Sequence, residues 1–285
     1  MNTTKVTLRK QKIRKDHTKL KFVLLLSLAL LLILLAAVSP KIVPYDPYEQ
    51  NLELVLKAPS AEHIFGTDQY GRDLFSRVIA GSRISIFSVL LLVCLNTFIG
   101  TAAGVICGYY GKKTDAVIMR ISDVFLAFPG MVFAIAVAGV MGGGIMNAVF
   151  ALACISWPKF ARIARSQVMT VKNMPFMAAA QMTGSGTFKI IRKHILPNIA
   201  GPVLVTAVLD IGTMMMELAG LSFLGLGATP PAAEWGSMMS SGRSLLQTSP
   251  WAILAPGAAI FITVMIFNLL GDTVRDLLDT RQRRK

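Results

Sequence analysis

Histidine and cysteine are scarce in this sequence, with three of each among 285 residues. The cysteines are Cys94, Cys107 and Cys154, and the histidines are His17, His63 and His194. Each cysteine lies in an apolar stretch without a CxxC spacing or a nearby histidine, and the histidines are far apart along the chain. The pattern therefore indicates neither a disulfide framework nor a zinc site, and the cysteines are typical of small buried apolar residues.

The sequence also lacks a nucleotide-binding loop. Gly66 and Gly71 have the GxxxxG spacing of a phosphate cradle, but Arg72 and Asp73 follow where such a loop needs Lys and then Ser or Thr. No other segment carries the motif. If this chain takes part in an ATP-driven process, the hydrolysis must therefore occur in another subunit.

Acidic residues are few, with 15 Asp and Glu against 29 Lys and Arg, which gives a net charge of +14. The chain is 54% hydrophobic with a mean hydropathy of +0.59, too apolar for one soluble core with a wetted surface. Its basic residues bracket apolar runs and do not form a face interleaved with aromatics, so nucleic acid is not an expected partner. The composition predicts an integral membrane protein in a lipid bilayer.

Six apolar runs are long enough to be considered as transmembrane helices, each of which needs about 20 residues. They cover residues 22–39, 84–109, 117–141, 145–163, 199–221 and 251–270. Pro129 lies inside the third run, where it is expected to kink or end a helix. The first run resembles a signal peptide in its basic flank and small terminal residues, but its length favours an uncleaved anchor.

The basic residues predict the orientation of these spans. With six spans the two termini share a side, and a cytoplasmic N-terminus places all but six of the 29 Lys and Arg on the inner side. The expected organisation is a basic cytoplasmic segment (1–21), a first span (22–39), an extracytoplasmic segment (40–83), a domain with five spans (84–275) and a cytoplasmic tail (276–285). Both termini are therefore predicted to be cytoplasmic.

A basic segment interrupts the apolar pattern between the fourth and fifth spans. Residues 159–193 contain seven Lys and Arg and no Asp or Glu. Helix-compatible residues end at Gly184-Ser-Gly186, a second short helix can start with Thr187 as its cap, and Pro197 is expected to close the segment. The sequence predicts two short helices joined by a glycine turn, although a plain basic loop also fits the positive-inside rule.

This segment resembles the EAA loop of ABC importer permeases, whose pattern is EAA, three residues, Gly, nine residues and I-x-L-P. The matching residues are Ala179, Ala180, Gly184, Leu196 and Pro197, while Ala178 stands in place of Glu and His194 in place of Ile. In that family the loop is the coupling helix that fits a cleft on the ATPase. The resemblance implies that residues 176–197, including Gly186, couple to an ATPase, with Phe176, Met177 and Met182 contributing shape and apolar packing.

Further blocks extend the resemblance over nearly the whole chain. They are GTDQYGRDLFSR (66–77), MRISDVFLAFP (119–129), WPKFARIARS (157–166), AGLSFLGLG (219–227), EWG (234–236) and FNLLGDTVRDLLD (267–279). They are similar, in the same order, to blocks of the dipeptide, oligopeptide and nickel permease subfamily. The resemblance implies an all-α permease with the MetI-like fold that catalyses no reaction, needs no cofactor and pairs with a second permease, one or two ATPase subunits and an extracytoplasmic binding protein.

Carboxylates within the membrane provide a second candidate site. Asp210, Met214 and Glu217 follow an i, i+4, i+7 spacing on the fifth span, so they share one stripe of the helix. A carboxylate at mid-membrane costs about 2.5–3.5 kcal/mol on insertion scales and normally faces protein or water. The stripe is therefore either a lining of the translocation path or a helix-packing cluster. Near the inner end of the third span, Asp123 is expected to pair with Arg120.

The outer block provides the third set of candidates. Thr67 and Asp68 are interpreted as capping or turn residues, and the surrounding residues are assigned to binding-protein docking or to structure. This set comprises Gly66, Thr67, Asp68, Gly71, Arg72 and Asp73. Residues 228–250 are too polar to span the membrane and are expected to form an outer re-entrant or lid-like loop.

The substrate is inferred from resemblance alone. The stretch LDIGTMMMELAGLSFLGLG, the AEWG sequence and the missing EAA glutamate look closer to the nickel branch than to the peptide branch. We therefore expect import of free or chelated nickel, with dipeptides or oligopeptides as the alternative and the metal ligands unknown. A channel or secondary transporter that does not use ATP is a further alternative, but the inverted repeats expected of such transporters are not evident.

Overall fold

A computed structural model describes the backbone of residues 2–278 and the side chains of residues 18–278. Helices dominate this part of the chain, and Thr67 and Asp73 form an isolated antiparallel bridge. The long helices are α1 (Asn2–Ile42), α2 (Leu74–Tyr110), α5 (Ile145–Lys172), α8 (Leu196–Phe223) and α10 (Trp251–Leu278). The shorter helices are η1 (Leu52–Leu54), α3 (Lys112–Leu126), α4 (Gly130–Val140), α6 (Pro175–Met182), α7 (Thr187–Ile190), the π-helical η2 (Ile191–Ile195), α9 (Trp235–Gly242) and η3 (Arg243–Leu245).

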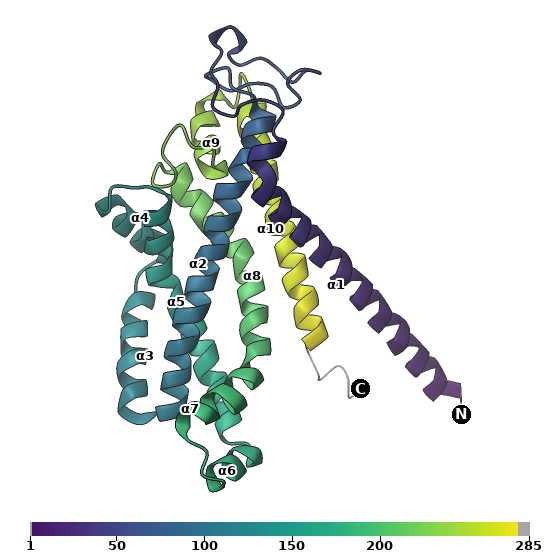
Figure 1. Cartoon of the computed structure of the whole chain (residues 1–285), viewed down its shortest axis with the longest axis vertical. Coiled ribbons are helices and arrows are strands. Elements are labelled where there is room, and N and C mark those ends of the chain that lie inside the picture. The colour runs from purple at the N-terminus through teal and green to yellow at the C-terminus, as the bar shows by residue number, and fades with distance from the viewer. Residues whose placement is uncertain (1, 279–285) are drawn as a thin grey trace.

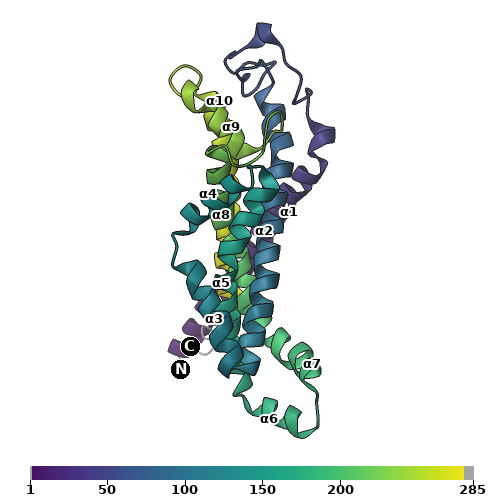
Figure 2. The same ribbon diagram turned by 90° about the vertical axis from the view of Figure 1, so that its left-hand side faces the viewer.

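The long helices form an elongated bundle with different structures at its two ends (Figure 1). The first described turn of α1 and the last turn of α10 lie toward the end that carries α6 and α7. At the opposite end, the loop between α1 and α2 and the short helix α9 form a cap (Figures 1 and 2). The predicted tail 276–285 lies outside the described residues from residue 279 onward.

The central pair of the bundle is α2 and α5, which approach closely along a row of glycines. Gly100, Gly104 and Gly108 recur every fourth residue on one face of α2. A Cβ atom built on Gly100 would lie 2.5 Å from Cβ of Phe160, and one on Gly104 would lie 2.4 Å from the backbone oxygen of Ala161. Small residues spaced in this way let membrane helices pack backbone to backbone. The row therefore fixes the distance between the two helices.

The predicted third span is wrong as a single straight helix. The structure divides it into α3 and α4, which are bent by 86° relative to each other. Pro129 is the N-cap residue of α4, and its ring disfavours a helical backbone at Phe128, so the helix ends just before it. With 11 residues, α4 extends only about 17 Å and cannot cross a bilayer core of about 30 Å by itself.

The six-span count stays a prediction. Among the described residues, four helical segments are long and apolar enough to cross a membrane: Thr18–Ile42, Leu74–Tyr110, Thr187–Phe223 and Trp251–Leu278. The bent pair adds a fifth if it counts as one span. The helix α5 has 28 residues, which is long enough, but Lys159, Arg162 and Arg165 make its second half polar. Pro158 lies inside α5 and does not end it.

The second span begins ten residues earlier than predicted, at Leu74 instead of Ile84. Asp73 is the reason, because its side chain accepts a hydrogen bond from the backbone N–H of Ser76 at 2.7 Å and so caps the helix. An apolarity scan cannot find this start because the first turns of α2 contain Arg77 and Arg83. The ten additional residues, nearly three turns, carry α2 into the outer cap.

Candidate coupling surface and translocation face

Residues 175–197, here called the coupling segment, extend beyond the bundle at the end opposite the cap (Figure 2). The segment contains α6, α7, η2 and the first two residues of α8. The expected two helices and glycine turn are present, but two boundaries differ from the prediction. Gly186, not Thr187, is the N-cap residue of α7, and Pro197 lies in the first turn of α8 instead of ending the segment. Proline is tolerated there because its missing N–H has no intrahelical partner.

The turn between α6 and α7 depends on Gly184. Its φ of +74° lies in the left-handed region that a side chain disfavours. The N–H of Gly184 donates to the carbonyl of Gln181 at 3.0 Å, and the N–H of Ser185 donates to the carbonyl of Ala180 at 3.3 Å. These two bonds form a Schellman motif, in which a left-handed residue ends the helix and satisfies its last carbonyls. Gly184 therefore fixes where α6 stops and how α7 departs.

Part of the coupling segment is anchored in the bundle. Met177, Ile190 and Ile195 are buried in a cluster with apolar residues from the inner ends of α2, α5 and α8, and Ala180 is buried as well. The expectation that Met177 contacts an ATPase is wrong for this structure, because its side chain is only 1% exposed and packs inward. The reason is the helical period: on α6, Met177 and Ala180 share the face that turns toward the bundle.

The opposite face of the coupling segment is apolar, basic and exposed. Met182 is 89% exposed and Phe188 is 77% exposed, while Phe176 is more than one-third exposed beside the ring of His194. The remaining candidates Ala178, Ala179, Gly186, Leu196 and Pro197 are also exposed. The motif comparison missed Phe188, because the family pattern leaves the nine residues after the glycine unspecified. Because the sequence predicts that the coupling segment lies outside the bilayer, these large exposed apolar side chains make it a candidate interaction surface.

The carboxylate stripe of α8 is divided between an ion pair and a free acid. Asp210 is completely buried and receives a hydrogen bond of 2.5 Å from Nζ of Lys159 on α5. Met214 is buried, and its sulfur lies 3.8 Å from Nδ2 of Asn96 on α2. Glu217 is half-buried and has no hydrogen-bond or ion-pair partner among the described residues. The structure therefore gives Asp210 a packing partner and leaves Glu217 as the unpaired acid.

Lys159 is the first of three basic residues on α5 that each bind an acid on a neighbouring helix. Arg162 donates to Asp123 at 2.7 Å, so the expected pairing of Asp123 with Arg120 is wrong. Arg165 binds Asp115 through two nitrogens. Because these residues recur every third position, they turn gradually from α8 toward α3. Sequence reasoning counted all three as part of a basic loop and missed their partners.

The outer candidate residues are mostly buried inside the cap. Thr67, Asp68, Arg72 and Asp73 have exposed fractions of 0–8%. Thr67 accepts a hydrogen bond from the N–H of Lys57 at 2.9 Å, and Asp68 accepts from the N–H groups of Tyr70 and Arg72. Asp68 is therefore a turn residue as expected, whereas the capping role belongs to Asp73. These side chains hold the loop together.

The two glycines of this block are needed for the backbone conformation of the loop. Gly66 and Gly71 have φ values of +72° and +71°. A Cβ atom on Gly71 would also lie 1.7 Å from the backbone oxygen of Asn51. Both positions therefore require glycine for the loop to fold back on itself, and not for contact with a phosphate.

The EWG block attaches α9 to α2. Glu234 is 2% exposed and caps α9, accepting from the N–H groups of Gly236 at 2.9 Å and Ser237 at 2.8 Å. The indole Nε1 of Trp235 donates to the carbonyl of Val78 at 2.8 Å. The expected lid-like loop is therefore a fixed helix packed on the bundle.

Substitution Trp235→Phe is expected to lower the free energy of unfolding by about 1–3 kcal/mol, because the carbonyl of Val78 loses its buried donor. Thermal unfolding of the detergent-solubilised protein measures this. Trp157→Phe is the matched control, since Trp157 packs on Phe125 and donates no hydrogen bond among the described residues. Equal destabilisation by both changes would contradict the assigned role of the Trp235 bond.

Comparison with known protein families identifies the family to which this chain belongs. A family model described as "Binding-protein-dependent transport system inner membrane component" matches residues 100–284. The chain belongs to this family. The permease is also similar to a solved structure of the MetNI methionine ABC transporter in an inward-facing conformation. The superposition gives a TM-score of 0.57 at 17% sequence identity and covers 70% of this chain and 95% of that chain. This likeness shows the fold alone.

Three relatives give the range of substrates. The permease is 42% identical to a dipeptide transport system permease of Alkalihalophilus pseudofirmus, covering 88% of this chain and 83% of that protein. It is 41% identical to a nickel transport system permease of Escherichia coli (87% and 90% covered). It is likewise 41% identical to a glutathione transport system permease of Pectobacterium atrosepticum (88% and 84% covered). These values are too similar to select one substrate.

The comparisons confirm the family and fold expected from the sequence blocks. The permease is a multi-pass inner-membrane subunit of an ABC importer of the dipeptide, nickel and glutathione type, and it is not an enzyme. A permease of this family works with an ATPase and a substrate-binding protein. The described residues contain no group of three or more His, Cys, Asp or Glu placed to hold a metal ion.

Proposed function

We propose that this chain is one half of a heterodimeric translocation pathway, with both termini cytoplasmic and the coupling segment bound to the ATPase. The observation that supports the proposal most is the exposed face of Met182 and Phe188, held on a segment whose other face is anchored in the bundle. The described ends of α1 and α10 lie toward the same end of the molecule (Figure 1). The Lys and Arg distribution supports a cytoplasmic location for that end.

The coupling segment has a direct mechanical connection to the candidate path. α7, η2 and α8 follow one another without a break, so one helical segment extends from Thr187 to Phe223. It carries Phe188 at one end and Asp210 and Glu217 farther along. A displacement of the segment by the ATPase would therefore tilt α8 as a unit. The ion pair of Lys159 with Asp210 would make α5 move with it.

Glu217 is proposed to face the path and to attract a cationic group of the substrate. An acid within a membrane span faces a protein interior or a water-filled cavity, and Glu217 has no hydrogen bond or ion-pair contact in the described part of this chain, although the charges of Lys159 and Asp210 act on it. One carboxylate balances the charge of one ammonium group, which is what a short peptide presents. We therefore propose a short peptide as the substrate.

Nickel is the second candidate, on the basis of the α8 sequence block and the similar nickel permease. A bare Ni²⁺ ion prefers several nitrogen or sulfur ligands, and the described residues offer no such group. A chelated ion would bring its own ligands and needs only charge and shape complementarity. In the proposal, nickel would therefore cross as a chelate.

Uptake by proteoliposomes that contain the complete importer separates the two substrates. The expected result is ATP-dependent accumulation of labelled dipeptide, and about fivefold slower uptake with Glu217→Gln, because an attraction of about 1 kcal/mol is removed. Accumulation of labelled nickel without dipeptide uptake would overturn the peptide proposal. Uptake that continues without ATP hydrolysis would instead support a channel or secondary transporter.

A further inference from the structure

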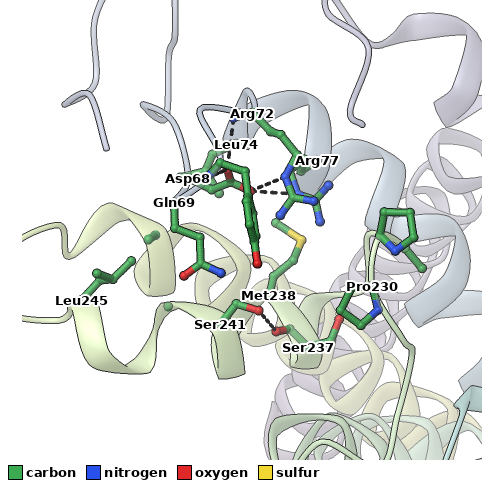
Figure 3. A pocket seen from close by; sticks show the side chains of 15 residues that line it. Asp68, Gln69, Arg72, Leu74, Arg77, Pro230, Ser237, Met238, Ser241 and Leu245 are labelled. Carbon is green, nitrogen blue, oxygen red and sulfur yellow. Dashed lines mark hydrogen bonds and ion pairs between the residues drawn. The ribbon is translucent and has the colours of Figure 1, made fainter. Parts of the chain in front are cut away.

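A small cavity with a mixed polar and apolar lining lies in the outer cap, between the start of α2 and α9 (Figure 3). Its volume is about 60 Å³, enough for several water molecules on a scale where one needs about 10–15 Å³. The loop before α2 contributes Asp68, Gln69 and Arg72, α2 contributes Arg77, and α9 contributes Ser237 and Ser241. None of these groups has a role in the proposed coupling mechanism.

Two buried guanidinium groups in this cavity share one carboxylate. Arg72 is 6% exposed, and its Nε donates to Oδ2 of Asp68 at 2.7 Å. Arg77 is 3% exposed, and its Nε lies 3.5 Å from the same oxygen in an ion pair that lacks hydrogen-bond geometry. That Nε is buried without a hydrogen-bond partner in the described structure. Figure 3 shows the two guanidinium groups next to Asp68, above Met238.

The two other buried acids of the cap, Asp73 and Glu234, are occupied elsewhere. One oxygen of Asp73 lies 2.9 Å from Nδ1 of His63, and the other accepts from the N–H of Ser76. Glu234 accepts hydrogen bonds from Ser85, Gly236 and Ser237. Arg72 and Arg77 therefore carry one positive charge more than Asp68 neutralises. A buried charge without a full set of partners is costly, so this arrangement favours an additional anion.

The chemistry of the cavity selects a carboxylate. Guanidinium groups bind carboxylates through parallel hydrogen bonds. The hydroxyls of Ser237 and Ser241 lie across the cavity from the arginines and already donate to the carbonyls of Glu234 and Ser237, so the arginines are the donors for an anion (Figure 3). One of the arginines, Arg77, is already held in place by a 2.7 Å bond from its Nη1 to the carbonyl of Pro47. The site is therefore built before any ligand arrives.

We propose that this cavity is a carboxylate-binding site, filled by an acidic side chain of the substrate-binding protein when it docks on the cap. The proposal rests on the proposed function, in which the cap is extracytoplasmic. A protein side chain fits the site because the cavity has room for a carboxylate tip but not for a whole peptide. Gln69 and the exposed Ser241 form its rim, where such a side chain would enter.

The proposed site can be tested by placing a carboxylate of the chain itself where the side chain of the substrate-binding protein would bind. Ser241→Asp places a carboxylate at the rim and should occupy the arginines, whereas Ser241→Asn is the matched neutral control. Binding of the purified substrate-binding protein to the importer in nanodiscs is measured at two salt concentrations. We expect Ser241→Asp to weaken binding at least about tenfold and to reduce its salt dependence, and Ser241→Asn to stay within about twofold of wild type.

The thermal midpoint and the basal ATPase rate show whether each variant is folded. A Ser241→Asp variant with an equal or higher midpoint and weaker docking supports the site. If Ser241→Asp and Ser241→Asn bound the substrate-binding protein with the same affinity, while the wild type bound it normally, the proposed site would be overturned but the proposed function would stand. A wild-type importer that does not bind its binding protein at all would instead contradict the proposed function. If free acetate or dipeptide raised the thermal midpoint of the wild-type importer while Ser241→Asp left docking unchanged, the cavity would bind a small carboxylate. That result would overturn the assignment of its ligand to the substrate-binding protein.

Discussion

Gly184→Pro is expected to abolish ATP-driven uptake while the protein still inserts into the membrane. Proline fixes φ near −65°, whereas the native φ of Gly184 is +74°. It also removes the N–H that donates to Gln181. Both bonds of the Schellman motif are then lost, so α7 leaves α6 in another direction and the exposed face of Met182 and Phe188 is displaced. Uptake and ATPase stimulation by the binding protein measure the effect.

A pair of alanine substitutions provides the control within the same turn. Gly184→Ala and Gly186→Ala make the same chemical change two residues apart, and neither added Cβ meets another atom within 4 Å. They differ in backbone conformation, because Gly186 has a φ of −65°. We expect Gly184→Ala to cost about 1–2 kcal/mol locally and to slow uptake, and Gly186→Ala to have little effect. Equal activity in both variants would show that the left-handed turn is not needed.

Lys159→Met is expected to give the largest loss of stability, about 3–5 kcal/mol, because it leaves the fully buried Asp210 carboxylate without its partner. The second oxygen of Asp210 already lacks a hydrogen bond. Asp210→Asn should cost less, since the side chain of Lys159 is 49% exposed and its ammonium can move toward water. Chemical unfolding in a defined detergent measures this asymmetry.

The double variant Lys159→Met with Asp210→Leu should recover most of the loss, because no buried charge remains. The nearby pair of Arg162 and Asp123 is the matched control on the same helix, with both side chains about half exposed. Its removal should cost only about 0–1 kcal/mol. If Lys159→Met were as mild as Arg162→Met, the ion pair would not tie α5 to α8.

Local features of the sequence predicted the coupling segment well. The glycine turn at Gly184 lies where the motif spacing placed it, and α6 ends at Met182 as the interrupted helix pattern indicated. Such features depend on residues within one or two turns of one another. The family resemblance rested on blocks of this kind, which is why the comparisons confirmed it.

Contacts between distant residues were not predictable in the same way. Lys159 and Asp210 are 51 positions apart. The sequence alone places Lys159 in the basic segment and makes Asp210 either a path-lining or a helix-packing acid, without naming its partner. The inward orientation of Met177 depends on where the inner ends of α2 and α5 lie. The glycine row of α2 was not predicted from the sequence, because its role depends on Phe160 and Ala161, which pack against it from another helix.

The bend at Pro129 lies between these two cases. The proline was expected to disturb the helix, but apolarity alone joined residues 117–141 into one span. The 86° angle and the short length of α4 depend on packing against α5, which the sequence pattern does not contain. The number of complete crossings is therefore the least predictable feature of the fold.

Site-specific cross-linking tests most directly whether the coupling segment is the cytoplasmic contact for an ATPase. In a variant without Cys94, Cys107 and Cys154, cysteine replaces Met182 on the coupling segment or the 78% exposed Leu52 in the outer cap. The account predicts that only Met182→Cys cross-links to the ATPase and that only Leu52→Cys reacts with a membrane-impermeant maleimide in intact cells. Labelling of Met182→Cys from outside, or its failure to cross-link to the ATPase, would contradict the account.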